Sequence, residues 1–153
     1  MDGHYWTDTQ FDDMSWHDNH IHGFRVLEGE QGLGVLELDI DYILEWLKEP
    51  NGRFRFRILP STLRFIDVCD LRMSLDYAAQ TAALGPFSIH SIERLIERRE
   101  RYDAKIWKIE LNWPVGEITF EASGFEQQGR GQPVVHEEQC LTASMRSGEA
   151  DQK

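Results

Sequence analysis

The segment from Leu36 to Glu45 limits the fold of this chain more than any other. Its apolar side chains (Leu36, Leu38, Ile40, Tyr42 and Leu44) alternate with polar positions that are acidic at Glu37, Asp39 and Asp41. Successive side chains of a β-strand point to opposite faces, so this alternation predicts an antiparallel strand with one face on a core. The other face is predicted to be acidic.

Several other segments show the same period of two. Glycines at 29 and 32, and the run Pro50-Asn51-Gly52, indicate hairpin connections between them. Pro60 predicts a break or bulge, because proline cannot donate a hydrogen bond to a central ladder. The expected strands cover residues 20–26, 36–45, 53–58, 62–75, 105–113 and 117–122, with a short edge strand within 134–141.

One segment is predicted to be helical. Ile89, Ile92, Leu95, Ile96 and Tyr102 recur at helical spacing within a run of good helix formers, and this predicts an amphipathic helix over about 89–102. A strand from 87 to about 94 that leads into a charged turn is the alternative.

These elements predict an α+β domain, predominantly antiparallel β, with six or seven strands in a sandwich or rolled sheet and one amphipathic helix. Residues 15–142 are expected to form a single domain, since 153 residues suffice for one core. Residues 1–14 are expected to form a flexible arm and residues 143–153 a disordered tail.

The negative charge of the chain is unevenly distributed. Residues 1–49 carry 12 acidic side chains against Arg25 and Lys48, whereas residues 50–153 are nearly neutral. This pattern excludes nucleic acid as an expected partner, because phosphate binding requires clustered basic residues. It favours a cationic protein, a metal ion, or solubility alone.

Localisation follows from what the sequence lacks. It has no apolar run of about 20 residues and no signal peptide at its start, which predicts a cytoplasmic protein without a membrane partner. Cys69 and Cys140 have no CxxC spacing, and two unpaired thiols are expected.

Four stretches of the sequence resemble a family of small bacterial proteins of uncharacterised function. They are Ser15-Trp16-His17-Asp18-Asn19, the segment 38–46 (LDIDYILEW), Pro60-Ser61-Thr62-Leu63 with Phe65, Asp67 and Val68, and the segment 116–120 (GEITF). The resemblance covers about residues 15–125. It implies a bacterial single-domain protein and transfers no catalytic residue.

A metal site is one candidate. His20 and His22 share one strand face and Asp39 and Asp41 share another, and imidazole with carboxylate suits Zn²⁺, Mn²⁺ or Fe²⁺. Against this, Phe24 lies on the histidine face, which makes that face apolar and places it opposite the aspartates. Only a bulge near Gly23 would bring the two pairs together.

The acidic residues also have a structural interpretation. Arg53, Arg55 and Arg57 would pair with the acidic strand face if the two strands are neighbours. Asp18 and Asn19 suit a turn that enters the next strand, in which their side chains bond to backbone groups. No GxSxG motif, activated cysteine or phosphate-binding glycine loop is present.

A non-catalytic interaction module is the favoured function. Tryptophans within an acidic region suit recognition of a basic protein, as in immunity-type inhibitors of cationic toxins or in regulatory proteins. The predicted binding residues are Trp16, Asp18, Asp39, Asp41 and Trp46, with burial of the tryptophans in the core as the alternative. A metal-dependent enzyme built on His20, His22, Asp39 and Asp41 is the second hypothesis, and no other cofactor is expected.

Overall fold

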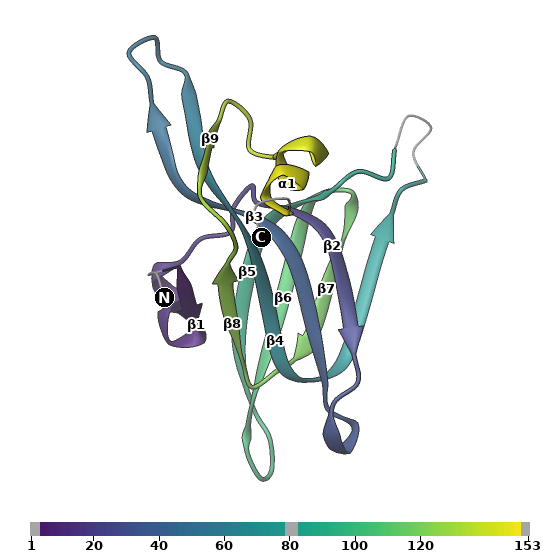
Figure 1. Cartoon of the computed structure of the whole chain (residues 1–153). Helices are drawn as coiled ribbons and strands as arrows, with labels where there is room; N and C mark the ends of the chain where they lie inside the picture. Colours follow the sequence, from purple (N-terminus) through teal and green to yellow (C-terminus); the bar gives the residue numbers. More distant parts are fainter. Residues whose placement is uncertain (1–3, 79–82, 151–153) are drawn as a thin grey trace.

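One long strand, β4 (Phe54–Asp76), belongs to both layers of the fold (Figure 1). The structure is a computed structural model and describes residues 4–78 and 83–150. Every strand pairing in it is antiparallel. The other strands are β1 (Tyr5–Thr7), β2 (His20–Leu27), β3 (Gly34–Lys48), β5 (Phe87–Arg98), β6 (Asp103–Trp113), β7 (Val115–Glu121), β8 (Gly124–Gly129) and β9 (Val134–His136).

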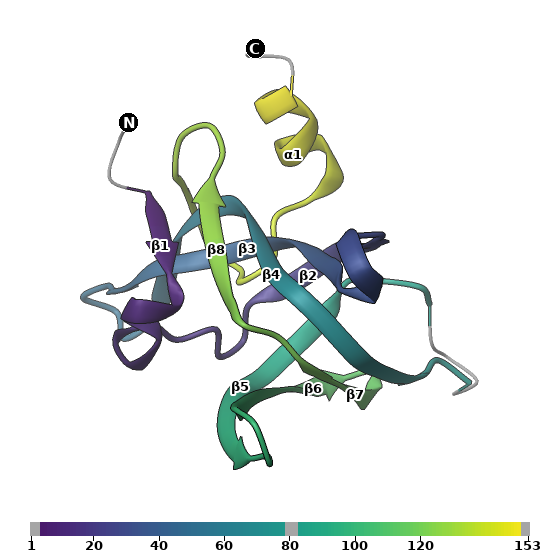
Figure 2. The same cartoon turned by 90° about the horizontal axis from the view of Figure 1, so that it is seen from below.

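The strands follow the order β1-β8-β4-β3-β2-β5-β6-β7, and β7 also pairs with the end of β4, so the sheet closes on itself. Figure 2 shows the layer of β2, β3, β4 and β8 crossing the layer of β5, β6 and β7 at a steep angle. The closure is weak at one side, where β2 and β5 share only the pairs His20–Ser88 and Ile21–Phe87.

The transfer of β4 from one layer to the other takes place at two aspartates in the left-handed conformation. Asp67 has φ 56° and Asp70 has φ 53°. Up to Ile66 the strand pairs with β8, and from Cys69 onwards it pairs with β7. Aspartate tolerates positive φ better than most residues, so these positions let the strand bend.

The space between the layers is filled by aromatic and aliphatic side chains. Trp107, Phe65 and Phe120 are almost fully buried, and the ring of Phe65 packs edge-on against the other two at 5.2 and 4.7 Å between centroids. A smaller cluster of Ile43, Phe56, Ile58 and Leu141 lies apart from this core. It joins the C-terminal segment to the β3–β4 hairpin.

The antiparallel, β-rich fold is confirmed, with nine strands in the described ranges instead of six or seven. The helix predicted over 89–102 is wrong, because β5 covers most of that range. Two short helical segments are 3-10 helices, η1 (Asp8–Asp13) and η2 (Glu30–Gly32). The α-helix of the described chain, α1 (Ala143–Ala150), lies where a disordered tail was expected.

Pro60 does not interrupt β4. The backbone N–H of Arg130 donates to the Pro60 carbonyl oxygen at 2.8 Å, on the edge where the chain leaves β8 before returning as β9. In an antiparallel strand the nitrogen and carbonyl of one residue point to the same edge. The missing N–H of Pro60 therefore lies in a gap between two partner strands.

The N-terminal arm also has a defined place. β1 pairs with β8, and Trp6, Phe11 and Met14 pack against the main core. Three ranges lie outside the described residues: 1–3 of the predicted arm, 79–82 between β4 and β5, and 151–153 of the predicted tail.

Candidate functional site

A bulge in β2 brings the predicted histidines and aspartates to the same face of the sheet. His20 pairs with Asp41 and Gly23 pairs with Asp39, so His22 is the extra residue between them. The extra residue reverses the alternation, and Phe24 consequently shares the inner face with Ile21 while His20 lies outside beside Asp41. The apolar character of Phe24 is thereby reconciled with a polar site on the outer face.

Asp41 is the centre of this face. Its side chain has no exposed surface, and its Oδ2 atom lies 2.7 Å from Nε2 of His22. The same oxygen accepts the backbone N–H of Leu141 at 2.8 Å. Oδ1 accepts a hydrogen bond from Nη1 of Arg146, on α1. The buried carboxylate thus has hydrogen-bond partners on both oxygens, as a buried charge requires.

Asp39 is half-exposed and is neutralised by two arginines. Its Oδ1 atom accepts from Nη2 of Arg130, in the loop after β8, and from Nη2 of Arg146. Both aspartates that were predicted to bind a cationic partner therefore pair with cations of their own chain.

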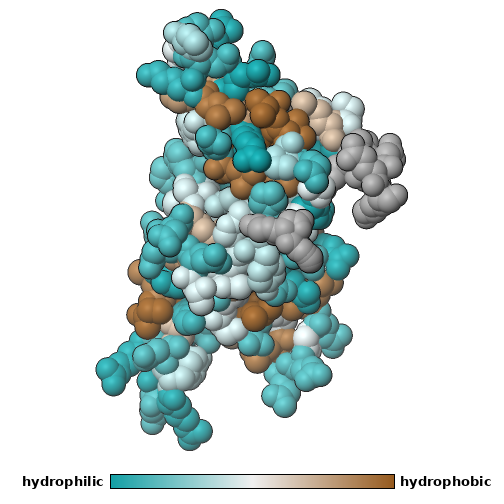
Figure 3. Space-filling view, turned by 60° about the vertical axis from the view of Figure 1, so that its left-hand side comes forward, coloured by the Kyte–Doolittle hydropathy of each residue, from teal (hydrophilic) through white to brown (hydrophobic). Residues whose placement is uncertain are grey.

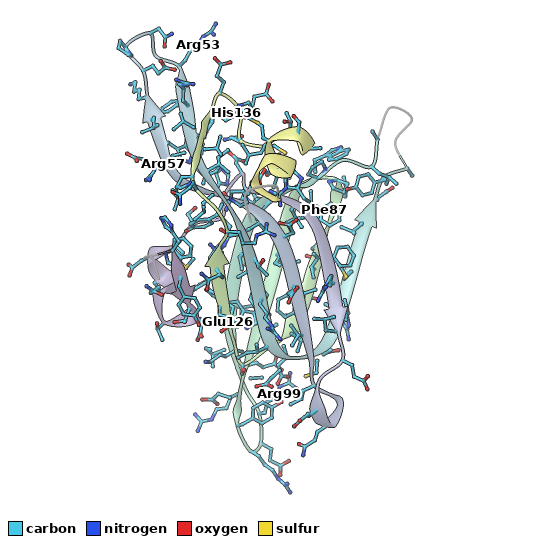
Figure 4. All side chains as sticks on the ribbon, in the orientation of Figure 1. Arg53, Arg57, Phe87, Arg99, Glu126 and His136 are labelled. Atoms are coloured by element: carbon cyan, nitrogen blue, oxygen red, sulfur yellow. The ribbon has the colours of Figure 1, made fainter. Side chains whose placement is uncertain are left out.

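The arginines predicted to neutralise the acidic face do not do so. Arg57 stands opposite Glu45 and Arg55 opposite Leu47, several residues beyond Asp41 along β3. Figure 4 shows Arg53 and Arg57 on the protruding β3–β4 hairpin. The expected pairing is wrong because the hairpin register places these side chains too close to its tip.

Cys140 completes the group around His22. Its Sγ atom lies 3.7 Å from Nε2 of His22, the same nitrogen that contacts Asp41. Burial, together with the negative charge of Asp41, raises the pKa of the Cys140 thiol to about 11. A catalytic cysteine requires a lowered pKa and an imidazole whose second nitrogen is oriented by the carboxylate, so this arrangement does not support nucleophilic catalysis.

His20 lies beside this group, directly opposite Asp41 in the β2–β3 register. Burial lowers the pKa of its imidazole below the ordinary value of 6.5, and the nearby charge of Asp41 opposes this shift only in part. Its Nδ1 atom is buried and has no hydrogen-bond partner among the described residues. A hydrogen bond to the backbone of Gln139 also opposes the shift in pKa, so it is the Nδ1 atom and not the whole ring that lacks a partner.

Asp18 lies in a turn and not on a free surface. Its φ is 64°, its backbone N–H donates to the carbonyl of Ile89 at 2.8 Å, and its carboxylate accepts from Asn112 and Gln139 at 3.0 and 3.2 Å. The neighbouring Asn19 is fully buried. The structural interpretation of this turn holds for Asn19, whose Oδ1 accepts the backbone N–H of Ile43, whereas the Asp18 carboxylate bonds to side-chain amides and not to backbone groups.

The two predicted binding tryptophans occupy different environments. Trp16 is buried in the core and donates its indole N–H to Oε1 of Gln127 at 2.9 Å. Trp46 is 46% exposed and packs edge-on against Phe56 and Phe54. Figure 3 shows hydrophobic side chains gathered near the top of the molecule, below its hydrophilic tip. Only Trp46 has a surface that a partner could contact.

A hollow of about 420 Å³ lies beside Trp46, and all its lining residues come from the first 49 residues of the chain. Asp13 and Glu45 contribute carboxylates that form no ion pair with any described residue, and Arg57, although opposite Glu45, does not reach it. The lining contains no lysine or arginine. The remaining residues are Ser15, His17, Asn19, Tyr42, Ile43, Leu44 and Trp46.

Most other acidic groups of this region are paired internally. Asp8 contacts Lys105, Asp12 contacts Arg94 and Glu37 contacts Arg25, each within 4.0 Å. Glu28 and Glu30 are exposed at the opposite end of β3, in the β2–β3 connection. The unpaired negative charge thus remains mainly at the two ends of the β3 strand.

Three residues that contact His22, Asp39 or Asp41 were not predicted from the sequence. Cys140, Arg130 and Arg146 lie more than 85 residues beyond Asp41 in the sequence, in a glycine-rich loop and in segments without strand or helix periodicity. Nothing in their local sequence indicates that they would cover the outer face of β2 and β3. The unpaired state of Cys140 and Cys69 was predicted and is confirmed.

Comparison with models of protein families, with curated proteins and with solved structures gives no match for this chain. Among the described residues, no helix has the length and apolar character needed to cross a membrane.

Proposed function

We propose that this protein is a non-catalytic interaction module that binds a cationic segment of another protein in the hollow beside Trp46. The observation that carries the proposal is the lining of this hollow, which combines two carboxylates without counter-ions, Asp13 and Glu45, with an exposed indole. A positively charged side chain of a partner that enters the hollow would meet carboxylates to pair with its charge.

The chemistry of the lining favours arginine or lysine as the inserted residue. A guanidinium or ammonium group is attracted to an aromatic face and to a carboxylate at once. Tyr42 and Glu45 lie on the same face of β3, because Leu44 is an extra residue in the ladder with β4, and Trp46 borders the hollow from the other face. Exposed aromatic residues with a charged surround are also typical of the residues that dominate binding energy at interfaces.

The proposal differs from the sequence-based prediction in its residues. Asp39 and Asp41 are removed from the binding surface because arginines of the same chain neutralise them, and Trp16 is removed because it is buried. The hollow retains Trp46 and adds Asp13 and Glu45. An immunity-like or regulatory role remains the class of function that such a surface suits.

A labelled arginine-rich peptide serves as the probe, and fluorescence anisotropy measures its binding to the full chain. Trp46→Ala, and the double substitution Asp13→Asn with Glu45→Gln, are each expected to weaken binding by about tenfold, the equivalent of roughly 1.4 kcal/mol.

The matched control is the double substitution Glu28→Gln with Glu30→Gln. It also removes two negative charges from the first third of the chain, but at the other end of β3. Equal weakening by both double substitutions would show that the peptide responds to net charge and not to the hollow, and the proposed function would then be abandoned.

A further inference from the structure

The side chains of His22, Asp41 and Cys140 converge on one point on the outer face of β2 and β3. One potential ligand atom from each, Nε2, Oδ2 and Sγ, lies within 4.8 Å of both others. These three atoms come from β2, from β3 and from the segment between β9 and α1, so tertiary structure brings them together. A nitrogen, an oxygen and a sulfur donor form a set that Zn²⁺ binds in proteins.

From this convergence we infer that His22, Asp41 and Cys140 form a binding site for a divalent zinc-type ion, and that the nearby His20, which lies outside this group of three, joins it as the fourth ligand when the ion binds. Tetrahedral zinc with its usual bond lengths places a sulfur and a nitrogen ligand about 3.6 Å apart. The Sγ atom of Cys140 and Nε2 of His22 are 3.7 Å apart. The nitrogen and the carboxylate oxygen, now 2.7 Å apart, would separate by about 0.6 Å as the ion replaces the hydrogen that they share.

His20 supplies an independent observation. It stands directly opposite Asp41 in the β2–β3 register, and its buried Nδ1 atom has no hydrogen-bond partner among the described residues. A buried ring nitrogen without a partner costs free energy that ligation would recover.

The groups around the cluster hold the Asp41 carboxylate in a fixed orientation. The Oδ2 atom of Asp41 accepts the backbone N–H of Leu141, and its Oδ1 atom pairs with Arg146. Ligating carboxylates are commonly held by such hydrogen bonds, which fix their orientation. Arg146 occupies the oxygen that faces away from His22 and leaves Oδ2 directed at the cluster.

Four protein ligands would saturate a tetrahedral ion, so the site is structural and not catalytic. The ion would fix the Cys140 segment to the central strands. On binding, Cys140 releases its thiol proton to solvent, and the hydrogen between Nε2 of His22 and Asp41 passes to solvent while Nδ1 of His22 takes one up, so the ring binds the ion through Nε2 and stays neutral. The site is distinct from the hollow beside Trp46 and does not depend on the function proposed for it.

Cobalt reports directly on thiolate ligation, so the chelator-treated full chain is titrated with Co²⁺ and then with Zn²⁺. The expected result is one Co²⁺ per chain, with the near-ultraviolet thiolate-to-cobalt charge-transfer band and tetrahedral visible bands, both removed by one equivalent of Zn²⁺. Cys140→Ser should abolish the charge-transfer band, whereas Cys69→Ser, the matched control, should retain it.

The histidine ligands are tested in the same assay. His22→Ala and His20→Ala are each expected to weaken binding by at least about tenfold, and His17→Ala, which removes an exposed histidine outside the cluster, to leave it unchanged. Circular dichroism of each variant checks the fold. The inference is overturned if the folded wild-type chain binds no stoichiometric metal at micromolar concentration, or if binding persists unchanged without Cys140.

Discussion

Leu141 donates its backbone N–H to the buried carboxylate of Asp41 at 2.8 Å, across 100 residues of sequence. The side chain of Leu141 is itself buried, among Ile43, Phe56 and Ile58. Polar and apolar contacts thus attach the same short segment to β3 and β4. The C-terminal part of the described chain is, by this criterion, a component of the folded domain and not an appendage.

Substitution of Asp41 tests how much these contacts contribute to the free energy of unfolding. Asp41→Asn keeps the size of the side chain but removes the buried charge beside Arg146, whose side chain is only 13% exposed and would keep only the half-exposed Asp39 as a counter-charge. We expect the free energy of unfolding to fall by about 3 kcal/mol in urea titrations. Glu45→Gln, at an exposed carboxylate without an ion-pair partner, should change it by less than about 0.5 kcal/mol. Similar values for both would contradict the buried pair.

The two predicted binding tryptophans should separate stability from recognition. Trp16→Ala removes a buried indole and its hydrogen bond to Gln127, and we expect a loss of about 3–5 kcal/mol in the free energy of unfolding. Trp46→Ala, at a half-exposed position on the hairpin, should cost about 1 kcal/mol or less while it weakens peptide binding. A larger stability loss for Trp46→Ala than for Trp16→Ala would be inconsistent with their burial.

His20 should make stability depend on pH. Because burial lowers its pKa in the folded state below the 6.5 of the unfolded chain, the unfolded state binds more protons as the solution is acidified. The contribution of His20 is complete above pH 6.5 and is lost as pH falls through the folded-state pKa. In urea unfolding experiments between about pH 7 and pH 5, the free energy of unfolding of His20→Gln should fall less than that of wild type.

His17→Gln provides the comparison for this experiment. The side chain of His17 is 52% exposed and lies outside the group around Asp41, so this substitution controls for the removal of a histidine elsewhere in the chain. If His17→Gln flattens the profile and His20→Gln does not, the assignment to His20 is incorrect.

The thiol of Cys140 should alkylate slowly. With a pKa raised to about 11, its thiolate fraction at pH 8 is roughly 200-fold below that of an ordinary cysteine, and the greater nucleophilicity of a more basic thiolate recovers about tenfold. We expect iodoacetamide to modify Cys140 roughly 20-fold more slowly than a small free thiol. Mass spectrometry of chelator-treated Cys69→Ser protein isolates this reaction, and alkylation at the rate of the free thiol would refute the raised pKa.

The bulges explain which parts of the fold the sequence could predict. Strand β3 was predictable from Leu36 to Tyr42 because an undisturbed period of two runs through that part. In β5, Ile89 and Ile92 both face the core although they are three residues apart, because His90 is an extra residue between Ile89 and Ser91 in the ladder with β6. The spacing of three imitates a helix, and the predicted helix over 89–102 follows from it.

The candidate site shows the same limit. His22 is the bulged residue that places the histidines on the face of Asp41. From the sequence a bulge near Gly23 could be named as the requirement for this arrangement but not predicted, since glycine permits a bulge without requiring one. The covering residues Cys140, Arg130 and Arg146 could not be predicted, because long-range contacts that bury polar groups leave no periodic pattern in the sequence. The short strands β1 and β8 escaped prediction for a similar reason, since β8 consists of glycine and glutamine apart from Phe125 and Glu126.

Because β4 pairs with β3 and β8 in one layer and with β7 in the other, a break in either layer disturbs the strand that both share. Local unfolding of one layer should therefore destabilise the other through the backbone of β4, and the domain should unfold in a single cooperative transition. A continuous strand of 23 residues acts in this way as the coupling element of the whole molecule.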